Sequence, residues 1–567
     1  MMQQILECVP NISEGRDQSI IDAVASVVHG VDGVKLLDVD AGAATNRTVI
    51  TFAGEPSAVI EAAFLLVKKA SELIDMSKQT GAHPRMGATD VCPLVPVAGM
   101  TLEDVVPYAH ALGERIGREL GIPGYFYESA AKEAKRKNLA NCRSGEYEGL
   151  SAKFQDSAWQ PDFGDVSGDA WVKTGATAVS ARNFLVAYNI NLNTTSTRWA
   201  NAIAFDIRER GRVKREGGSL TGKIVKDAQG NPVNVPGELP CVKGIGWFIE
   251  EYGVAQISYN LTDISVTSMH AAFDATCQSA ERRGLRVTGS ELIGLVPLQA
   301  MLDAGKHYLA KQKRSSGVSD AEIIKIAIKS MGLDELGPFD PAKRIIEYQL
   351  ADAGETNLVS MSLTDFANET ASESPAPGGG SIAAYAGALG ASLATMVANL
   401  SAHKRGWSDQ WEVFSKDAEQ GMAIQKQLLS QVDKDTAAFN RIMEAFGLAK
   451  GTDEEIAFRL NAIQLATKHA IEVPLDVMQT AMQIFSLASN MVERGNPNSV
   501  TDAAVAALCA RTAVEGAWLN VRVNCADCKD AAFVAEMTSR GEVLLASAHT
   551  QSDAIVAKCH EVIGNTQ

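Results

Sequence analysis

At 567 residues the chain is too long for one hydrophobic core, and domains of the usual size, about 150 residues, predict roughly three or four of them. Its 52 lysines and arginines against 68 aspartates and glutamates give a net charge of −16, which argues against a nucleic-acid or membrane-surface partner. The cysteines are scattered, the first residues lack the features of a signal peptide, and no apolar run approaches the roughly 20 residues of a membrane span. We therefore expect a cytoplasmic protein without a membrane span.

The first third of the chain alternates strand and helix patterns. Apolar runs predict strands at 4–10, 34–39, 45–52 and 91–97, and helical periodicity predicts helices at 18–30 and 57–76. The order β-α-β-β-α-β is that of the split βαβ, ferredoxin-like fold, in which two helices cover one face of a largely antiparallel sheet. Thr101 and Asp104 then stand at capping-box spacing for a further helix.

The same order recurs in the second third. Strands are predicted at 183–192, 242–250, 254–261 and 285–288, with helices at 196–210 and 267–283. The intervening segment 211–240 is rich in glycine, proline and asparagine, which indicates a surface excursion or hairpin. We expect two α+β subdomains, 1–181 and 182–349, with a ligand cleft between them.

The composition changes near Tyr348. Residues 350–358 have the character of a linker, and alanine-rich helical periodicity then continues through 359–567 with almost no strand signal. The last part of the chain is therefore predicted to be an all-α helical bundle. The expected architecture is multidomain, with two ferredoxin-like α+β subdomains followed by this bundle.

A polar turn at 81–90 carries the first candidate for chemistry. His83 and Arg85 flank Pro84 between glycines, and the proline disfavours a helix at this point. An imidazole presented by such a loop can take and give a proton near pH 7, so His83 is a candidate catalytic residue. A histidine that caps a strand or bonds a carbonyl would give the same pattern.

The helical part opens with a second candidate, the glycine run Gly378-Gly379-Gly380-Ser381, which leads into a helix from Ile382. Amides at a helix start can bind an anion or let a ligand approach the backbone. The run is no P-loop, because the lysine that ends that motif is absent. Residues of these types are also common where a helix begins, without any role in ligand binding.

A third candidate is Asp435, which lies in a predicted helix. It falls on an apolar stripe marked by Leu428, Val432, Phe439 and Met443, whereas Asp433 falls off that stripe. An inward aspartate is costly unless it is partnered or functional. A structural bond across the bundle is the alternative.

Several motifs resemble known families. The runs ECVPNISEG at 7–15, LDVDAG at 37–42, NRTV at 46–49, HPRMG at 83–87 and VAYNIN at 186–191 resemble glutamate formiminotransferases. The runs PGGGS at 377–381, DTAAF at 435–439, VPL at 473–475 and GN at 495–496 resemble formiminotetrahydrofolate cyclodeaminases and methenyltetrahydrofolate cyclohydrolases. In this order, and over almost the whole chain, they resemble the bifunctional formimidoyltransferase-cyclodeaminases of histidine breakdown.

For the first half, the resemblance implies transfer of a formimino group from N-formimino-L-glutamate to N5 of tetrahydrofolate, with His83 as general acid and base. Asp40 is a candidate orienter of His83, unless it only ends its strand, and Arg47 a candidate for holding an anionic group. The family's folate-binding segment matches 164–175. Its candidates are Gly164, Trp171 as a stacking face, Val172, Lys173, Thr174 and Gly175.

For the second half, the resemblance implies cyclisation of 5-formiminotetrahydrofolate to 5,10-methenyltetrahydrofolate with release of ammonia. Asp435 would donate a proton to the leaving nitrogen, and Gly378, Gly379, Gly380 and Ser381 would let the planar folate approach the backbone. No metal, redox cofactor or prosthetic group is expected, and the close pair Cys525 and Cys528 lacks a second pair at metal spacing. Tetrahydrofolate, as its polyglutamate, is the co-substrate of both halves, and the family implies a homo-oligomer.

Two other functions remain open: a methenyltetrahydrofolate cyclohydrolase fused to a transferase, and a non-catalytic folate-binding scaffold. A polyglutamate tail would need local cations on a chain of charge −16. The candidates are Arg208, Arg210, Arg212, Lys214 and Arg215, with His403, Lys404 and Arg405 in the bundle. A solvated run of charges is the alternative for the first group.

Overall fold

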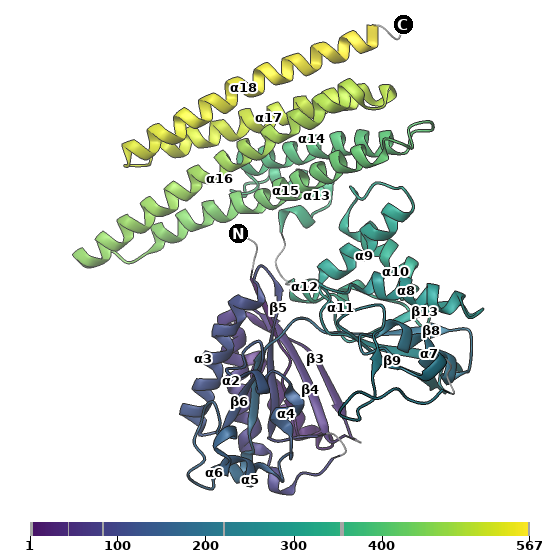
Figure 1. Ribbon diagram of the computed structural model, residues 1–567. Coiled ribbons are helices and arrows are strands. Elements are labelled where there is room, and N and C mark those ends of the chain that lie inside the picture. Colours follow the sequence, from purple (N-terminus) through teal and green to yellow (C-terminus); the bar gives the residue numbers. More distant parts are fainter. Residues whose placement is uncertain (1–3, 44, 82–83, 219–221, 352–356, 565–567) are drawn as a thin grey trace. The chain divides into compact units, whose positions relative to one another are not determined.

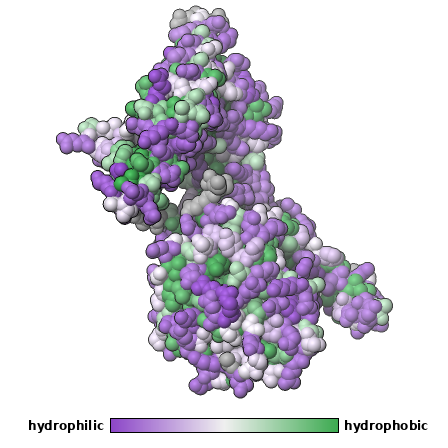
Figure 2. Space-filling model, turned by 90° about the vertical axis from the view of Figure 1, so that its left-hand side faces the viewer, coloured by the Kyte–Doolittle hydropathy of each residue, from purple (hydrophilic) through white to green (hydrophobic). Residues whose placement is uncertain are grey.

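The computed structural model describes residues 4–43, 45–81, 84–218, 222–351 and 357–564 (Figure 1). The chain forms two compact units, one made of 1–304 with 327–352 and the other of 305–326 with 353–567. Hydrophilic side chains predominate on the surface in Figure 2, in keeping with the net charge of −16. The predicted division into an α/β region followed by a mostly helical region is confirmed.

The first unit begins with a seven-stranded sheet. Its strands are β1 (Ile5–Cys8), β2 (Asn11–Ile12), β3 (Val34–Gly42), β4 (Arg47–Gly54), β5 (Thr89–Ala98), β6 (Gly124–Glu128) and β7 (Thr177–Ala181). β1 and β2 together lie between β4 and β5, antiparallel to both, while β3 pairs with β4 at one edge. The sheet continues through β5 into β7 and β6 by parallel pairing, an extension that the sequence did not predict.

Three helices bury one face of this sheet: α1 (Gln18–Ala25), α2 (Pro56–Leu73) and α3 (Leu102–Leu120). α1 starts where Asp17 accepts hydrogen bonds from two amides of its first turn, and α3 starts at the predicted capping box of Thr101 and Asp104. The other face is covered at its β6 end by α4 (Leu139–Arg143) and α5 (Leu150–Gln155), which pack on Tyr125 and Tyr127. On the β3–β4 side of the sheet, helix α12 (Ile346–Leu350) contacts both strands.

A four-stranded antiparallel sheet follows in the same unit, in the order β11-β12-β8-β13. Its strands are β8 (Val186–Leu192), β11 (Val242–Ile249), β12 (Val254–Leu261) and β13 (Val287–Ile293), with helices α7 (Thr197–Ile207) and α8 (Met269–Glu281). The apolar residues of β8 alternate along the strand, as period-two patterning requires, and Tyr188, Ile190 and Leu192 are buried together with the intervening Asn189 and Asn191. Within 211–240, β9 (Arg212–Val213) pairs with β10 (Asn234–Val235), so the predicted hairpin is present.

The chain then continues through helices that end the first unit and build the second. They are α9 (Leu298–Lys311), α10 (Asp320–Met331), α11 (Pro341–Arg344), α12 (Ile346–Leu350), α13 (Leu363–Thr370), α14 (Gly379–Ala402), α15 (Trp411–Gly447), α16 (Asp453–Arg494), α17 (Val500–Cys525) and α18 (Ala531–Gly564). Residues 357–564 contain no strand. The long helices pack lengthwise around an alanine-rich core to which α14 and α17 contribute most of the small residues (Figure 1).

Among the described helices, α14 alone is long and apolar enough to cross a membrane, with a mean hydropathy of 1.5 over its most apolar window. Of that window, 61% is buried against other helices, which is the usual position of a core helix.

Two candidate active sites

The first candidate site lies in the first unit, where the described residues of three loops meet: 13–17, 42–43 with 45–47, and 79–81 with 84–87. Glu14 organises them, because its Oε1 accepts the amides of Gly15, Arg16 and Asp17 at 3.0, 2.8 and 3.0 Å. Its Oε2 accepts Gln79 Nε2 at 2.9 Å. Burial alone would raise the pKa of Glu14, but these hydrogen bonds outweigh it and hold the pKa below its ordinary value.

Asn46 fastens the second loop to the other two. Its Oδ1 accepts the amide of Gly15 at 3.0 Å, and its Nδ2 donates to Gln79 Oε1 at 2.6 Å and to the carbonyl of Thr80 at 2.9 Å. The residue has a φ of 50°, a left-handed conformation that asparagine tolerates better than most residues. A Cβ on Gly81 would lie 2.3 Å from the carbonyl of Thr45, so the loops are in close contact.

His83 lies outside the described residues, and its role stays a prediction. The chain on both of its sides is firmly held. Arg85 is 8% exposed, and its Nη2 donates to the carbonyl of Gln79 at 2.6 Å and to Glu148 at 3.0 Å. The amide of Met86 donates to Asp90 Oδ1 at 3.0 Å.

Arg47 begins β4 beside this turn. Its half-buried guanidinium lies near Asp90, Arg143 and Tyr127. Burial lowers the pKa of Arg47, and the Asp90 carboxylate raises it. Arg143 pairs with the Asp90 carboxylate, and Arg47 lies near the same carboxylate, so two guanidiniums gather at this point of the site. Asp40 is exposed on the edge strand β3 opposite Val49, and its predicted partner His83 is not described.

The segment 164–175 meets the same turn at its C-terminal end. The amide of Ala88 donates to the carbonyl of Thr174 at 2.7 Å, and Gly175 bridges to Gly87. Gly175 has a φ of 66°, and a Cβ there would lie 2.2 Å from the carbonyl of Met86. The structure thus brings Thr174 and Gly175 to the His83 turn.

The remaining candidates of this segment have packing partners elsewhere. Gly164 lies against Ile122, whose carbonyl would be 2.3 Å from a Cβ. Trp171, in helix α6 (Ala170–Thr174), is half-buried and edge-on to Phe154, with ring centroids 5.2 Å apart. Exposed Val172 accepts the Tyr147 hydroxyl at 2.6 Å, and exposed Lys173 donates to the carbonyl of Glu72 at 2.8 Å. These contacts position the segment against the α/β sheet.

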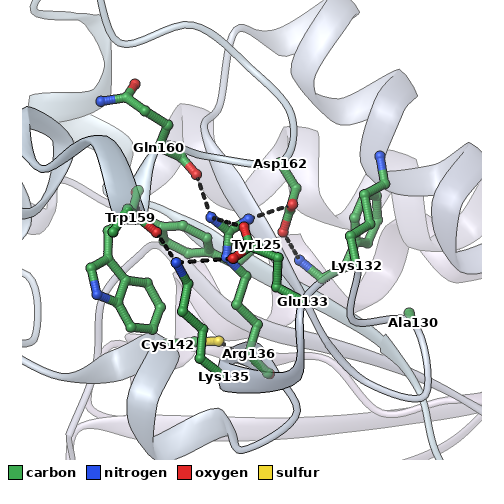
Figure 3. A network of polar contacts seen from close by, with 12 residues as sticks. Tyr125, Ala130, Lys132, Glu133, Lys135, Arg136, Cys142, Trp159, Gln160 and Asp162 are labelled. Atoms are coloured by element: carbon green, nitrogen blue, oxygen red, sulfur yellow. Dashed lines mark hydrogen bonds and ion pairs between the residues drawn. The ribbon is translucent and has the colours of Figure 1, made fainter.

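A polar network anchors the chain just before Gly164 (Figure 3). Arg136 is 4% exposed, pairs with Asp162 and donates to the carbonyl of Gln160 at 2.9 Å. The second oxygen of Asp162 accepts the amide of Phe126 at 2.9 Å. The Tyr125 hydroxyl donates to the carbonyl of Trp159 at 2.6 Å. Arg136 and Asp162 therefore hold the segment on β6. Because their opposite charges are paired with each other, neither is available to bind a charged ligand.

The second candidate site lies in the helical unit at the start of α14. Ser381 Oγ donates to the carbonyl of Val432 at 2.9 Å and contacts Asp435 Oδ2 at 3.1 Å. A Cβ on Gly380 would lie 2.1 Å from Asp435 Oδ1, so only glycine leaves the carboxyl group its place. Burial raises the pKa of Asp435, and the hydrogen bonds from Ser381 lower it by less. A carboxyl of raised pKa can hold a proton closer to neutral pH and act as an acid.

A cavity of about 180 Å³ opens beside this carboxyl group. Its lining comprises Pro375, Ala376, Gly378, Gly379, Asp435, Thr436, Ala438, Phe439, Ile442, Ala470, Asn520 and Asn524. The structure thus brings the predicted glycine run and Asp435 together. Sequence reasoning missed the two asparagines, whose spacing of four residues on a mostly apolar helix was the available signal.

The prediction that Leu428, Val432, Phe439 and Met443 mark one buried stripe beside Asp435 was partly wrong. Leu428 and Val432 are buried, but Phe439 is 39% and Met443 54% exposed. α15 extends beyond the core at its C-terminal end, so periodicity there no longer marks the interior. Asp433, expected to lie off the stripe, accepts the amide of Leu358 at 2.8 Å.

The candidate cations for a folate tail line cavities in the first unit. Arg208 and Arg210 border one of about 580 Å³, and Arg208, Arg212, Lys214 and Arg215 border another of about 1030 Å³. Arg212 also pairs with Asp206. In the helical unit, burial and nearby Arg314 lower the pKa of His403, and Lys404 lies over the Trp407 ring. No group of metal-ligating side chains occurs among the described residues.

Comparisons with known proteins cover both sites. Family models match at 5–182 (formiminotransferase domain, N-terminal subdomain), 187–351 (formiminotransferase domain) and 362–542 (formiminotransferase-cyclodeaminase). The formimidoyltransferase-cyclodeaminase of Mus musculus is 42% identical over 98% of each chain. The glutamate formimidoyltransferase of Streptococcus pyogenes is 41% identical over 54% of this chain and 94% of its own. The methenyltetrahydrofolate cyclohydrolase of Methylorubrum extorquens is 38% identical over 34% of this chain and 91% of its own.

Proposed function

The chain belongs to the formimidoyltransferase-cyclodeaminase family, and from this premise we propose that it is a bifunctional folate enzyme of histidine degradation. It transfers the formimino group from N-formimino-L-glutamate to N5 of tetrahydrofolate, which yields L-glutamate. It then cyclises 5-formiminotetrahydrofolate to 5,10-methenyltetrahydrofolate and releases ammonia. The observation that carries the second step is the Asp435 carboxyl group, of raised pKa, set against the glycine run in a cavity.

In the transfer step, N5 attacks the formimino carbon and a tetrahedral adduct forms. The glutamate nitrogen must gain a proton before it leaves, and we assign that relay to His83, a role worth about 10²–10⁴-fold in rate. Support comes from the rigid attachment of the turn to Glu14, Asn46 and Asp90. Arg47 is assigned to an anionic group of a substrate, and Asp40 to orienting His83. The end of the 164–175 segment is assigned to folate because it adjoins this turn.

In the cyclisation step, the formimino group reacts as its protonated form, the formiminium cation, and N10 attacks its carbon, which forms the N10–C bond and leaves an NH₂ group on that carbon. Asp435 takes the N10 proton and delivers it to the exocyclic nitrogen. The exocyclic C–N bond then breaks and ammonia leaves. One carboxyl group can serve both transfers, because the proton removed from N10 is the proton that ammonia carries away.

For the architecture, we propose two split βαβ, ferredoxin-like subdomains, 1–181 and 182–349, a linker at 350–358 and a helical bundle at 359–567. The strand orders β3-β4-β1-β5 and β11-β12-β8-β13 support this, since each places the first strand between the third and the fourth. Some relatives match only the first part of this chain or only the helical part, which supports the proposal that the two parts function independently. We further propose a cytoplasmic homo-oligomer.

The test is ammonia release from formiminoglutamate and tetrahydrofolate by the full chain. The proposal requires one ammonia for each glutamate formed. The similarity of the helical part to a methenyltetrahydrofolate cyclohydrolase makes that activity the second candidate. Glutamate production without ammonia, together with hydrolysis of supplied methenyltetrahydrofolate, would establish it. Tight folate binding without glutamate production would instead establish a scaffold.

A further inference from the structure

Two asparagines in the cavity beside Asp435 have no role in the proton transfers described above. Asn520 and Asn524 lie one turn apart on α17, and both line the cavity. Residues four apart on a helix share one face, so the two side chains reach the cavity together.

Their partners fix the orientation of both side-chain amides. Asn520 Nδ2 donates to the carbonyl of Gly516 at 2.9 Å, and Asn524 Nδ2 donates to the carbonyl of Ala470 at 2.7 Å. A carbonyl oxygen can only accept, so the NH₂ group of each amide must face it. Each Oδ1 therefore remains as an acceptor, and no group in the described part of the chain donates to it.

The cavity is rich in acceptors and has no positive charge. Its lining residues include one carboxyl group, that of Asp435, and no lysine, arginine or histidine. Thr436 Oγ1 is a buried hydroxyl that no described residue hydrogen-bonds, although buried hydroxyls ordinarily have a partner. A ligand group that carries N–H donors or positive charge fits this lining.

The one-carbon unit of the reaction has that charge throughout. A formimino group is a basic nitrogen on an amidine-like carbon, so its bound form is the formiminium cation. After N10 attacks, the proton moves from N10 to the exocyclic nitrogen and neutral ammonia leaves. The positive charge then resides on the N5–C–N10 bridge of the product, so it stays in the cavity from substrate to product.

On the basis of the proposed cyclodeaminase activity, we infer that Asn520 and Asn524 hold this cation through their amide oxygens. Gly379 of the glycine run borders the Asn520 amide, since a Cβ there would be 3.4 Å from Asn520 Nδ2 and 3.9 Å from Oδ1. The pair selects a cationic one-carbon unit over a neutral formyl group of the same size. It also holds the formimino carbon where N10 and Asp435 can reach it.

The test compares a cationic and a neutral inhibitor of cyclodeamination, measured with supplied 5-formiminotetrahydrofolate and the full chain. The cationic inhibitor is 5,10-methenyltetrahydrofolate. The neutral inhibitor is 5-formyltetrahydrofolate, in which oxygen replaces the formimino nitrogen of the substrate. In Asn520→Leu and Asn524→Leu, we expect Ki for the cation to rise by about tenfold to a hundredfold, the usual value of a hydrogen bond to a charged group. Ki for the neutral ligand should stay near that of the unmodified chain.

Asn399→Leu is the matched control, because Asn399 Nδ2 also donates to a carbonyl, that of Gly317 at 2.7 Å, outside this cavity. It should change neither Ki. Where a variant turns over too slowly for inhibition, the difference in Kd between the two ligands replaces Ki.

Equal loss of both ligands in the Leu variants would mean that the asparagines bind the pterin ring and would overturn the inference. Unchanged selectivity would overturn it as well. Both results leave the proposed function intact provided the unmodified chain releases ammonia, whereas failure of that release refutes the function itself.

Discussion

At the scale of single residues, Gly380 is the position where the helical site tolerates the least change. Its missing Cβ leaves the space that Asp435 Oδ1 occupies. We expect Gly380→Ala to displace the carboxyl group and reduce cyclodeamination of supplied 5-formiminotetrahydrofolate by about 10²-fold or more, while transfer continues. Gly447→Ala is the control, since a Cβ there meets nothing within 4 Å. Full activity in Gly380→Ala would show that the carboxyl group works from another position.

Glu7 on β1 is a buried carboxyl group that should make the stability of the fold depend on pH. It is 4% exposed, and burial raises its pKa from 4.5 to about 7 despite Arg182, which lowers it. The folded-state pKa therefore exceeds the unfolded value, so the stabilising contribution is complete below pH 4.5 and is lost as the pH rises through about 7. We expect Glu7→Gln to escape this loss and to exceed the unmodified chain in stability at pH 8 by up to about 3 kcal/mol.

The measurement for Glu7 is thermal unfolding at pH 5 and pH 8. Glu250→Gln, at an exposed position, should show no such pH dependence. A Glu7→Gln variant whose advantage is the same at both pH values would contradict a raised pKa.

At the scale of elements, the network of Figure 3 fixes β6 and the segment that leads to Gly164. Arg136 and Asp162 are 4% and 6% exposed at their side chains, so removing one partner leaves a buried charge. We expect Arg136→Met to destabilise the first unit by about 3–5 kcal/mol. Arg118→Met breaks an exposed pair with Glu119 and should cost less than about 1 kcal/mol. Calorimetry of the full chain measures both, and equal small shifts would show that the buried pair is solvated.

The elements also show what the sequence could and could not predict. The order of strands and helices around both large sheets followed from periodicity, and the Thr101 capping box formed as expected. The short β2 and the parallel extension through β7 were missed, because two-residue strands and pairing between distant strands leave no local pattern. Phe439 and Met443 were assigned to the core because a helical pattern does not reveal where a helix leaves its neighbours.

The sites were predictable to different degrees. Asp435 and the glycine run lie far apart in sequence but meet in one cavity, as the family resemblance implied they should. Asn520 and Asn524 were missed because their relevance depends on which helices pack together, and periodicity alone does not determine that. Trp171 and Gly164 were candidates because the family resemblance implied a folate-binding segment there, and the structure gives both a packing partner.

At the scale of the whole molecule, the two sites are expected to work independently. His83→Asn should abolish transfer and leave cyclodeamination of supplied 5-formiminotetrahydrofolate, and Asp435→Asn should do the reverse. Each substitution removes a proton-transferring group and nearly preserves the size of the side chain. The loss of proton transfer adds about 2.7–5.4 kcal/mol to the activation barrier of the affected reaction. Separate assays of glutamate and ammonia measure the two activities. If both activities fall in either variant, the sites are coupled or the residue stabilises the assembly.

On a chain of net charge −16, binding of a polyanionic folate tail would need local cations, and Arg208 and Lys214, which line one cavity, are candidates. We expect KM for a polyglutamylated substrate to rise more steeply with ionic strength than KM for the monoglutamate, because salt screens exposed charges. Steady-state kinetics over a salt series measures this. The monoglutamate is the internal control, and parallel curves would exclude a role for these cations in holding the tail.

The loop after Glu14 has a further consequence for inhibition. Three successive amides that converge on one point form a nest, a backbone motif that ordinarily captures phosphate or sulfate from solution. Here the Glu14 carboxylate occupies the nest and accepts all three amides, so the anion-binding position is already filled by the chain itself. We therefore expect inorganic phosphate not to bind in this nest. Anions that compete at the transferase site should bind instead near Arg47 and Arg143.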